Sequence, residues 1–119
     1  MIDNIYNRLK GYPGLELMQR QTVDATPGGS GLFFRGVTEK TRRTDLLGGV
    51  ECLKTYHFRL ARYDDQSDSG VFFLLLGAWI ERGAPDEWQV SLENAHCSRT
   101  SPGLSLWEAD LEITLWEDR

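Results

Sequence analysis

The sequence has few of the residue types on which most small enzymes and metal sites depend. Its 119 residues include two cysteines and two histidines. Neither Cys52 nor Cys97 lies in a CxxC pair or a Cys/His cluster, so the usual zinc-site spacings are excluded. We therefore expect no metal and no cofactor. We expect both thiols to be reduced, as in a reducing compartment, and a disulfide between Cys52 and Cys97 is the alternative.

Long apolar runs are also missing. The longest covers residues 71–80 and is broken only by Gly77, and ten residues are too few to cross a bilayer. The first residues, "MIDNIYNRLK", are polar and acidic where a secretory signal needs an apolar centre. These features predict a cytoplasmic protein with no membrane partner.

Charge is unevenly distributed along the chain, which has a net charge of −5. Residues 1–63 hold ten Lys and Arg against six Asp and Glu, whereas residues 64–119 hold three Arg against twelve Asp and Glu. An acidic chain is a poor candidate for general nucleic-acid binding, so no specific nucleic-acid partner is expected. This uneven charge distribution favours subunits that associate head to tail. The open alternative is that each charge only solvates the helix or strand that carries it.

The length and the apolar content of 40% predict one globular domain over residues 1–119. Near the N-terminus, apolar residues recur at helical spacing, at Ile2, Ile5, Tyr6 and Leu9. Gly11 and Pro13 end this short amphipathic helix. A second helix is predicted from about Asp68 to Arg82, because Gly83 and Pro85 follow the apolar run and Ser67 or Asp68 can cap it.

The remaining segments read mainly as strands, predicted over residues 32–37, about 50–63, 87–100 and 104–118. Residues 24–31 form a loop, and residues 38–49 are either a long loop or an extended hairpin arm. In the predicted strand at about 50–63, one face carries Cys52, Lys54, Tyr56, Phe58 and Leu60. The last two strands are expected to form an antiparallel hairpin around Pro102-Gly103. The predicted class is α+β, with a mostly antiparallel sheet of about four strands and both helices packed on one face.

The central helix is apolar almost all round, and a sheet covers only part of such a helix. We therefore expect part of it to be buried between subunits, with Phe73 and Leu76 as the candidate interface residues. The alternative is that residues 38–49 fold over the helix within one chain.

Candidate catalytic residues are scarce. Cys52 and His57 lie five apart on one strand and so point to opposite faces, whereas a Cys52–His96 pair across strands stays open. Glu108, Asp110 and Glu112 share one face at about 7 Å spacing, as a glycosidase pair or a metal site would. Solvent-facing positions of an alternating strand explain the same row. A small ligand-binding or enzymatic domain that uses these residues is the alternative function.

The polar segment "TEKTRRTDLLGG" concentrates cations next to a turn. Lys40, Arg42, Arg43 and Asp45 are candidate protein-interface residues. A solvated hairpin and a nucleic-acid contact are the alternatives, although no aromatic residue lies within the segment for base stacking.

The order of segments resembles the small tail terminator proteins of long-tailed bacteriophages and prophages, often described as minor tail or minor capsid proteins. The resemblance runs from the helix "IDNIYNRLKGYP" through the "DLLGG" turn and the strand "YHFRLARYDD". It continues with the apolar helix ending in "AWIE" and closes with the strand "WEADLEITLWED". The chain departs from the family in the short "RGAPDEW" segment that follows the helix.

The resemblance implies a non-enzymatic assembly protein. Such a protein forms a ring, commonly hexameric, that caps the tail tube, stops its polymerisation and joins it to the head connector. Its partners would be further copies of itself, the tube protein and a head-completion protein. Its location would be the host bacterial cytoplasm and then the virion. An adaptor on the head side of the same junction is a further alternative.

Overall fold

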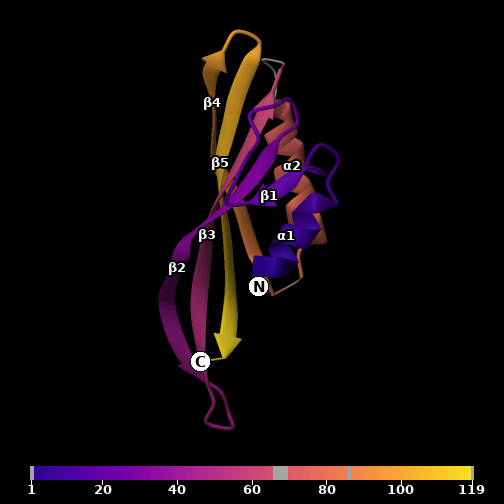
Figure 1. Ribbon diagram of the computed structural model, residues 1–119. Helices are drawn as coiled ribbons and strands as arrows, with labels where there is room; N and C mark the ends of the chain where they lie inside the picture. The colour runs from indigo at the N-terminus through magenta and orange to yellow at the C-terminus, as the bar shows by residue number, and fades with distance from the viewer. Residues whose placement is uncertain (1, 66–69, 86, 119) are drawn as a thin grey trace.

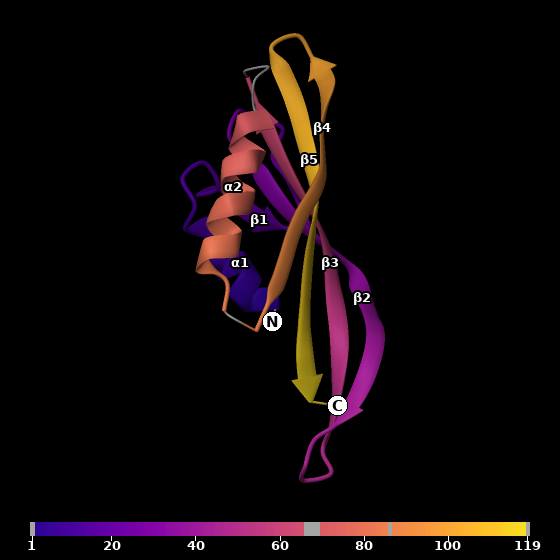
Figure 2. The ribbon, with the colours of Figure 1, turned by 180° about the vertical axis from the view of Figure 1, so that it is seen from behind.

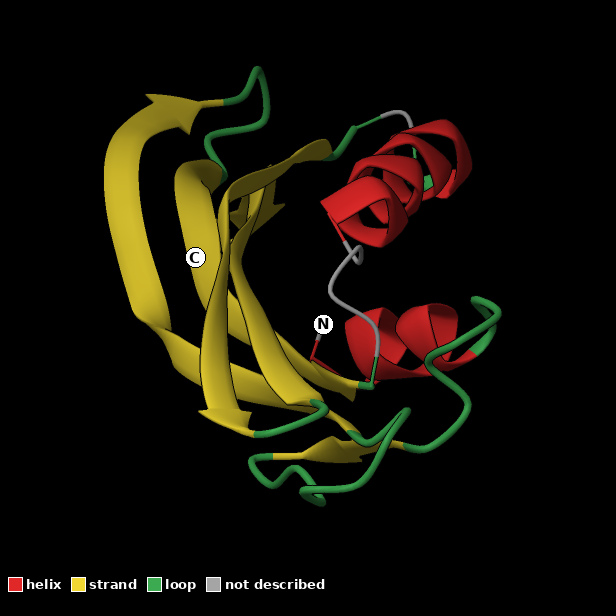
Figure 3. Ribbon diagram, turned by 90° about the horizontal axis from the view of Figure 1, so that it is seen from above, coloured by secondary structure: helices red, strands yellow, loops and turns green. Residues whose placement is uncertain are grey.

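The structure is a computed structural model that describes residues 2–65, 70–85 and 87–118. In chain order the elements are α1 (Ile2–Lys10), β1 (Met18–Arg20), β2 (Ser30–Thr44), β3 (Val50–Asp64), α2 (Gly70–Gly83), β4 (Gln89–Ser101) and β5 (Leu104–Asp118). The α+β class is confirmed, and both helices lie on the same side of a curved sheet (Figure 3). The proposed capping residues Ser67 and Asp68 lie outside the described residues.

The sheet has five strands in the order β1-β2-β3-β5-β4. The expectation of about four strands missed β1, which pairs in parallel with Ser30–Leu32, whereas the other pairings are antiparallel. The β4–β5 hairpin turns at Pro102-Gly103 as predicted, and Gly103 takes the positive φ of +78° that this turn requires.

Residues 38–49 were predicted to form either a long loop or an extended hairpin arm, and for residues 38–44 the prediction of a hairpin arm is confirmed. They continue β2 well beyond the predicted strand at 32–37, and β2 pairs with β3 through to Thr44↔Val50. Two bulges, after Phe34 and after Glu39, interrupt this pairing. The strand pattern was hidden because residues 37–44 are all exposed and therefore show no apolar alternation.

The core lies between the helices and one face of the sheet. Both strand predictions of this face are confirmed, since Phe58 and Leu60 of β3 are buried, as are alternate residues of β5. The core residues on the elements are Ile5 and Leu9 from α1, Met18 from β1, Leu32 from β2, Phe58 and Leu60 from β3, Phe73, Leu76 and Ile80 from α2, and Ala109, Leu111, Ile113 and Leu115 from β5. Each large side chain buried here contributes about 1.5–3 kcal/mol to folding.

The molecule is elongated, with extents of 59 × 24 × 21 Å. The helices cover only part of the sheet, and a three-stranded ribbon of β2, β3 and β5 continues past them (Figures 1 and 2). We call this ribbon the extension: residues 39–44 of β2, 50–54 of β3 and 115–118 of β5, together with the tip at residues 45–49. The rest of the fold is the body, and Thr55↔Thr114 marks the boundary, because β4 begins opposite Thr114. None of the helices in the described residues has the length and apolar character needed to span a membrane.

Candidate functional site

The face of the sheet that points away from the helices, here called the outer face, carries both histidines and the carboxylate row. On β3 this face presents His57 and Arg59, and on β5 it presents Glu108, Asp110 and Glu112, in the register His57↔Glu112 and Arg59↔Asp110. The sequence prediction that Glu108, Asp110 and Glu112 share a face is therefore correct. The cause is the side-chain period of two along paired strands.

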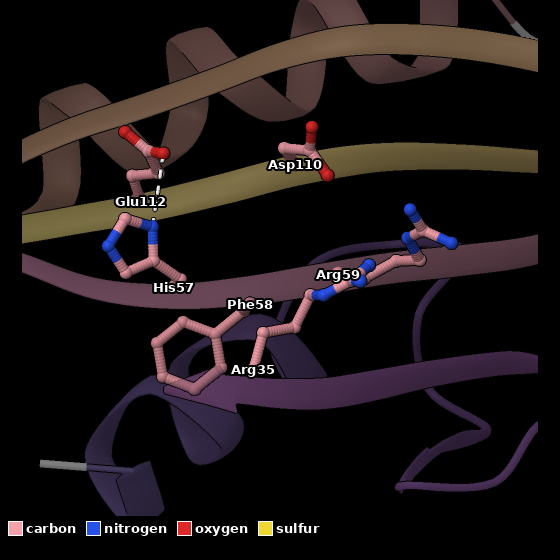
Figure 4. Close-up of a pocket in the computed structure, with 6 residues that line it drawn as sticks. All are labelled: Arg35, His57, Phe58, Arg59, Asp110 and Glu112. Carbon is pink, nitrogen blue, oxygen red and sulfur yellow. Dashed lines mark hydrogen bonds and ion pairs between the residues drawn. The ribbon is translucent and has the colours of Figure 1, made fainter. Parts of the chain in front are cut away.

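A hollow of about 420 Å³ lies on the outer face, lined by Arg35, His57, Phe58, Arg59, Asp110 and Glu112 (Figure 4). A second hollow of about 460 Å³ shares Arg35 and Arg59 and extends over Phe33, Phe34 and Glu108. Cations and carboxylates alternate around both. They are suited to a ligand of mixed charge rather than to a simple anion.

A hydrogen-bonded chain of three polar side chains runs beside the hollow. Thr38 Oγ1 and His57 Nε2 share a hydrogen bond of 2.6 Å, and His57 Nδ1 lies 3.2 Å from Glu112 Oε1. Hydroxyl, imidazole and carboxylate stand in the order found in hydrolase triads. The sequence analysis did not find these three linked side chains, because they come from three strands and Thr38 was not assigned to a strand.

The rest of the carboxylate row is held by cross-strand partners. Glu108 accepts from Arg59 Nη1 at 3.2 Å and lies 3.6 Å from His96 Nε2, and Asp110 accepts from Asn94 Nδ2 at 3.0 Å. No group of three or more His, Cys, Asp or Glu side chains within the described residues is placed to hold a metal ion. The row therefore lies on the uncovered face of the sheet, as the alternation predicted, and its members make hydrogen bonds and ion pairs with neighbouring strands.

Both cysteines are free, Cys52 buried and Cys97 exposed. Cys52 pairs with Glu117 on the helix-facing side of β5, whereas His57 pairs with Glu112 on the outer face. His96 pairs with Glu108 and so also belongs to the outer face. The Cys52–His96 pair left open by the sequence is therefore excluded, because its members lie on opposite faces of the sheet.

The candidate interface cations lie on the extension and make local contacts. Arg42 forms an ion pair with Glu39, whose carboxylate holds the pKa of the guanidinium above its ordinary value. Arg43 Nη2 lies 2.8 Å from Glu51 Oε2, and its guanidinium stacks 3.9 Å from the centre of the Trp116 ring. Lys40 makes no ion pair within the described residues.

The tip of the extension is built around Asp45. Its Oδ1 accepts from the backbone N–H groups of Leu47 at 2.9 Å and Gly49 at 2.8 Å, and Gly48 N donates to the Asp45 carbonyl. Gly48 has a φ of +84°, a conformation that favours glycine. This ordered turn holds Leu46 and Leu47 fully in solvent. The sequence analysis named Asp45 as a candidate interface residue but did not name these two leucines. The signal that could have found them is a pair of large apolar residues next to a Gly-Gly pair.

Phe73 and Leu76 are not surface residues, and their assignment to an interface was wrong. They are 2% and 0% exposed, because this side of α2 packs into the body's own core. Among the described side chains of α2, the large apolar residues that are exposed are the intervening Leu74 and Leu75, at 75% and 58%. A continuous apolar run does not reveal which side of a helix faces the sheet.

Tyr56 links the body to the extension. Its hydroxyl donates to the Glu117 carboxylate, with contacts of 2.7 and 2.8 Å to the two oxygens. Lys54 Nζ lies 3.7 Å from the same carboxylate. Burial first, and then the bond to Glu117, raises the pKa of Tyr56 to about 12.

No protein-family model matches the chain, and no curated protein matches it.

Proposed function

We propose that this chain is a tail terminator, a non-enzymatic assembly protein of a long-tailed phage or prophage. The observation that carries the proposal is the extension, a three-stranded ribbon that leaves the body and ends in two solvent-exposed leucines. An ordered apolar tip adds nothing to the chain's own core. Exposed apolar groups of this kind are typical of contacts with other proteins.

The proposed assembly is a ring, commonly hexameric in the family that the sequence resembles. The ring caps the finished tail tube, stops its polymerisation and offers its other side to the head connector. The partners are further copies of the chain, the tube protein and the head-completion protein. The protein acts in the host cytoplasm and then at the head-tail junction of the virion. Lys40, Arg42 and Arg43 stay candidate contacts, because all three are exposed on the extension.

Deletion of the gene from the phage or prophage that carries it tests this function directly. Electron microscopy of lysates should show tail tubes of excessive and variable length, free of heads, and a plasmid copy of the gene should restore normal tails. Tails of normal length that fail to join heads would instead identify a head-side adaptor and overturn the terminator role. Normal virions in the deletion strain would overturn both.

The Thr38–His57–Glu112 chain favours a second candidate, an ester hydrolase that uses the adjoining hollow. In that reaction Thr38 Oγ1 attacks an ester carbonyl and passes its proton through His57 Nε2 to the departing alcohol. Water then releases the acid and restores the hydroxyl. Hydrolysis of a nitrophenyl ester that is lost in both Thr38→Ala and His57→Gln, but kept in Thr41→Ala, would support this candidate. Equal rates in all of these variants would remove it.

A further inference from the structure

Two side chains of opposite charge line the outer-face hollow of about 420 Å³ without an ion-pair partner in the described part of the chain. They are Arg35 of β2 and Asp110 of β5. Arg35 is exposed, and the Asp110 carboxylate accepts a hydrogen bond from the neutral amide of Asn94. The two charges do not pair with each other, because β3 lies between their strands (Figure 4). The hollow therefore holds one unpaired cation and one unpaired anion.

The other charged groups around the hollow are already engaged. Glu112 Oε1 lies 3.2 Å from His57 Nδ1, and Arg59 Nη1 lies 3.2 Å from Glu108 Oε2. Each of these contacts joins neighbouring strands and fixes the side chains that form the wall of the hollow. The charges left for a ligand are thus the two unpaired ones.

The backbone of β2 keeps this part of the outer face open. A bulge between Phe34 and Gly36 leaves Arg35 as the extra residue of the strand, and bulges commonly re-aim a side chain. Gly36 stands opposite His57 and has a φ of +137°, which favours glycine. A Cβ at Gly36 would meet no heavy atom within 4 Å, so the space beside Arg35 is free. A glycine inside a strand is typical of places where a ligand approaches the backbone closely.

We propose that this hollow binds a small zwitterion, an organic molecule with a carboxylate at one end and an ammonium group at the other. The carboxylate contacts the Arg35 guanidinium, and the ammonium group contacts the Asp110 carboxylate. The backbones of β2 and β5 are two strand spacings, or about 10 Å, apart. Since both side chains reach into that distance, a short aliphatic chain between the two ligand charges fits the gap. The ω-amino carboxylates have this form.

The two signs of charge disfavour ligands that carry only one. An anion that approaches Arg35 also comes close to the carboxylates of Asp110 and Glu112. A cation that approaches Asp110 meets the guanidinium groups of Arg35 and Arg59 in the same way. Like charges at this range oppose binding, whereas a zwitterion satisfies both signs at once. The proposal goes beyond both candidate functions, because binding of this kind needs neither a ring nor a nucleophile.

An NMR titration of the full chain tests the site with three probes of equal chain length. The probe ε-aminohexanoate carries both charges, whereas hexanoate and hexylamine carry one each. We expect ε-aminohexanoate to shift the backbone amide signals of Gly36 and His57, and to bind about tenfold or more tightly than either control probe. No shifts at these residues, or equal affinity for hexanoate or hexylamine, would overturn the proposal.

Variants of the two unpaired charges locate the ligand. Arg35→Gln and Asp110→Asn each remove one charge and should weaken binding of ε-aminohexanoate about tenfold. Arg35→Lys keeps the charge and should retain most of the affinity. Unchanged affinity in either Arg35→Gln or Asp110→Asn, with an unchanged melting temperature, would contradict the proposed contacts and overturn the site.

Lys40→Gln is the matched control for the loss of a positive charge. Lys40 is also an exposed cation of β2 that makes no ion pair among the described residues, but it lies outside the hollow. Its replacement should leave the affinity for ε-aminohexanoate unchanged. A loss as large as that of Arg35→Gln would show that the probe responds only to the net charge of the protein, and it would overturn the proposal.

Discussion

Along β3, Phe58 and Leu60 lie in the body beneath the helices, whereas Leu53 and Lys54 lie in the extension beyond them. The body is stabilised by burial of apolar side chains on one face of the sheet. The extension shares the same strands and buries Cys52 and Leu115, but its other contacts are ion pairs, the stack of Arg43 on Trp116 and the hydrogen bonds of Asp45. Contacts of the second kind are weak in water, so the extension keeps its shape without adding much to the stability of the fold.

This difference separates folding from assembly. The body buries most of its large apolar residues by itself, whereas the tip of the extension presents Leu46 and Leu47 to solvent. Substitutions in the body should therefore lower stability, and substitutions at the tip should alter assembly without doing so. The following predictions test this division, starting with the largest expected effect.

The largest effect is expected at Leu76 of α2, with its neighbour Leu75 as the matched control. Leu76 is 0% exposed and Leu75 is 58% exposed, so the same truncation removes core packing in one case and little in the other. Leu76→Ala should lower the free energy of unfolding by about 2–5 kcal/mol. Leu75→Ala should change it by no more than about 0.5 kcal/mol. Urea denaturation measures both, and equal losses would show that the assignment of the buried side of α2 is wrong.

A smaller loss in the free energy of unfolding is expected at the boundary between the body and the extension. Thr55 is buried, and its Oγ1 lies 2.8 Å from Thr114 Oγ1 on the neighbouring strand. Thr55→Val leaves the Thr114 hydroxyl unpaired and should cost about 1–3 kcal/mol.

The double change Thr55→Val with Thr114→Val removes both hydroxyls and should recover most of that loss, because Val suits a paired strand position. A double variant no more stable than the single one would show that the hydroxyl pair does not account for the loss. Chemical denaturation of the wild type, the single variants Thr55→Val and Thr114→Val and the double variant gives the coupling free energy between the two hydroxyls directly.

In the extension, Arg43→Ala should cost no more than about 1 kcal/mol, because its partners Glu51 and Trp116 are near the surface. Arg43→Lys keeps the charge but loses the flat stack, and it should show most of the same loss. Hydrogen exchange of β2 and β3 should increase within the extension and stay unchanged in the body. Increased exchange throughout the sheet would contradict the division.

The smallest effect at neutral pH concerns Tyr56, whose pKa is raised from 10.0 to about 12. The neutral phenol is favoured in the folded state, so its contribution is fully present below pH 10 and is lost as the pH rises toward about 12. Between these values the unfolded chain binds fewer protons at this group than the folded one, and stability therefore falls with pH. Absorbance of tyrosinate should show a late-titrating group that disappears in Tyr56→Phe. The same titration curve in both proteins would contradict the assignment.

The sequence predicted those parts of the fold in which one face of an element is buried. Alternation made β5 and β3 recognisable, and Pro102-Gly103 located the turn between β4 and β5. The same rule failed for residues 38–44, which are polar on both faces and are held in the strand by partners distant in sequence. It also missed β1, whose three residues are too few to show a period.

Site residues could be predicted only from the alternation of side chains between the two faces of a single strand. Alternation correctly placed Cys52 and His57 on opposite faces and placed Glu108, Asp110 and Glu112 on one face. It could not show that Thr38 reaches His57, since two bulges shift the register of β2. Nor could it show which leucines of α2 face outward, because that depends on how the helix packs on the sheet.

The central claim is that the tip serves assembly and not folding, and replacement of the tip tests it most directly. Residues 45–49 can be exchanged for Asn-Gly, a two-residue turn that closes a hairpin while Thr44 and Val50 stay paired. The measurement is the distribution of tail lengths, by electron microscopy, in phage particles that carry this variant. We predict a stable protein with overlong, uncapped tails. Tails of normal length joined to heads would contradict the account.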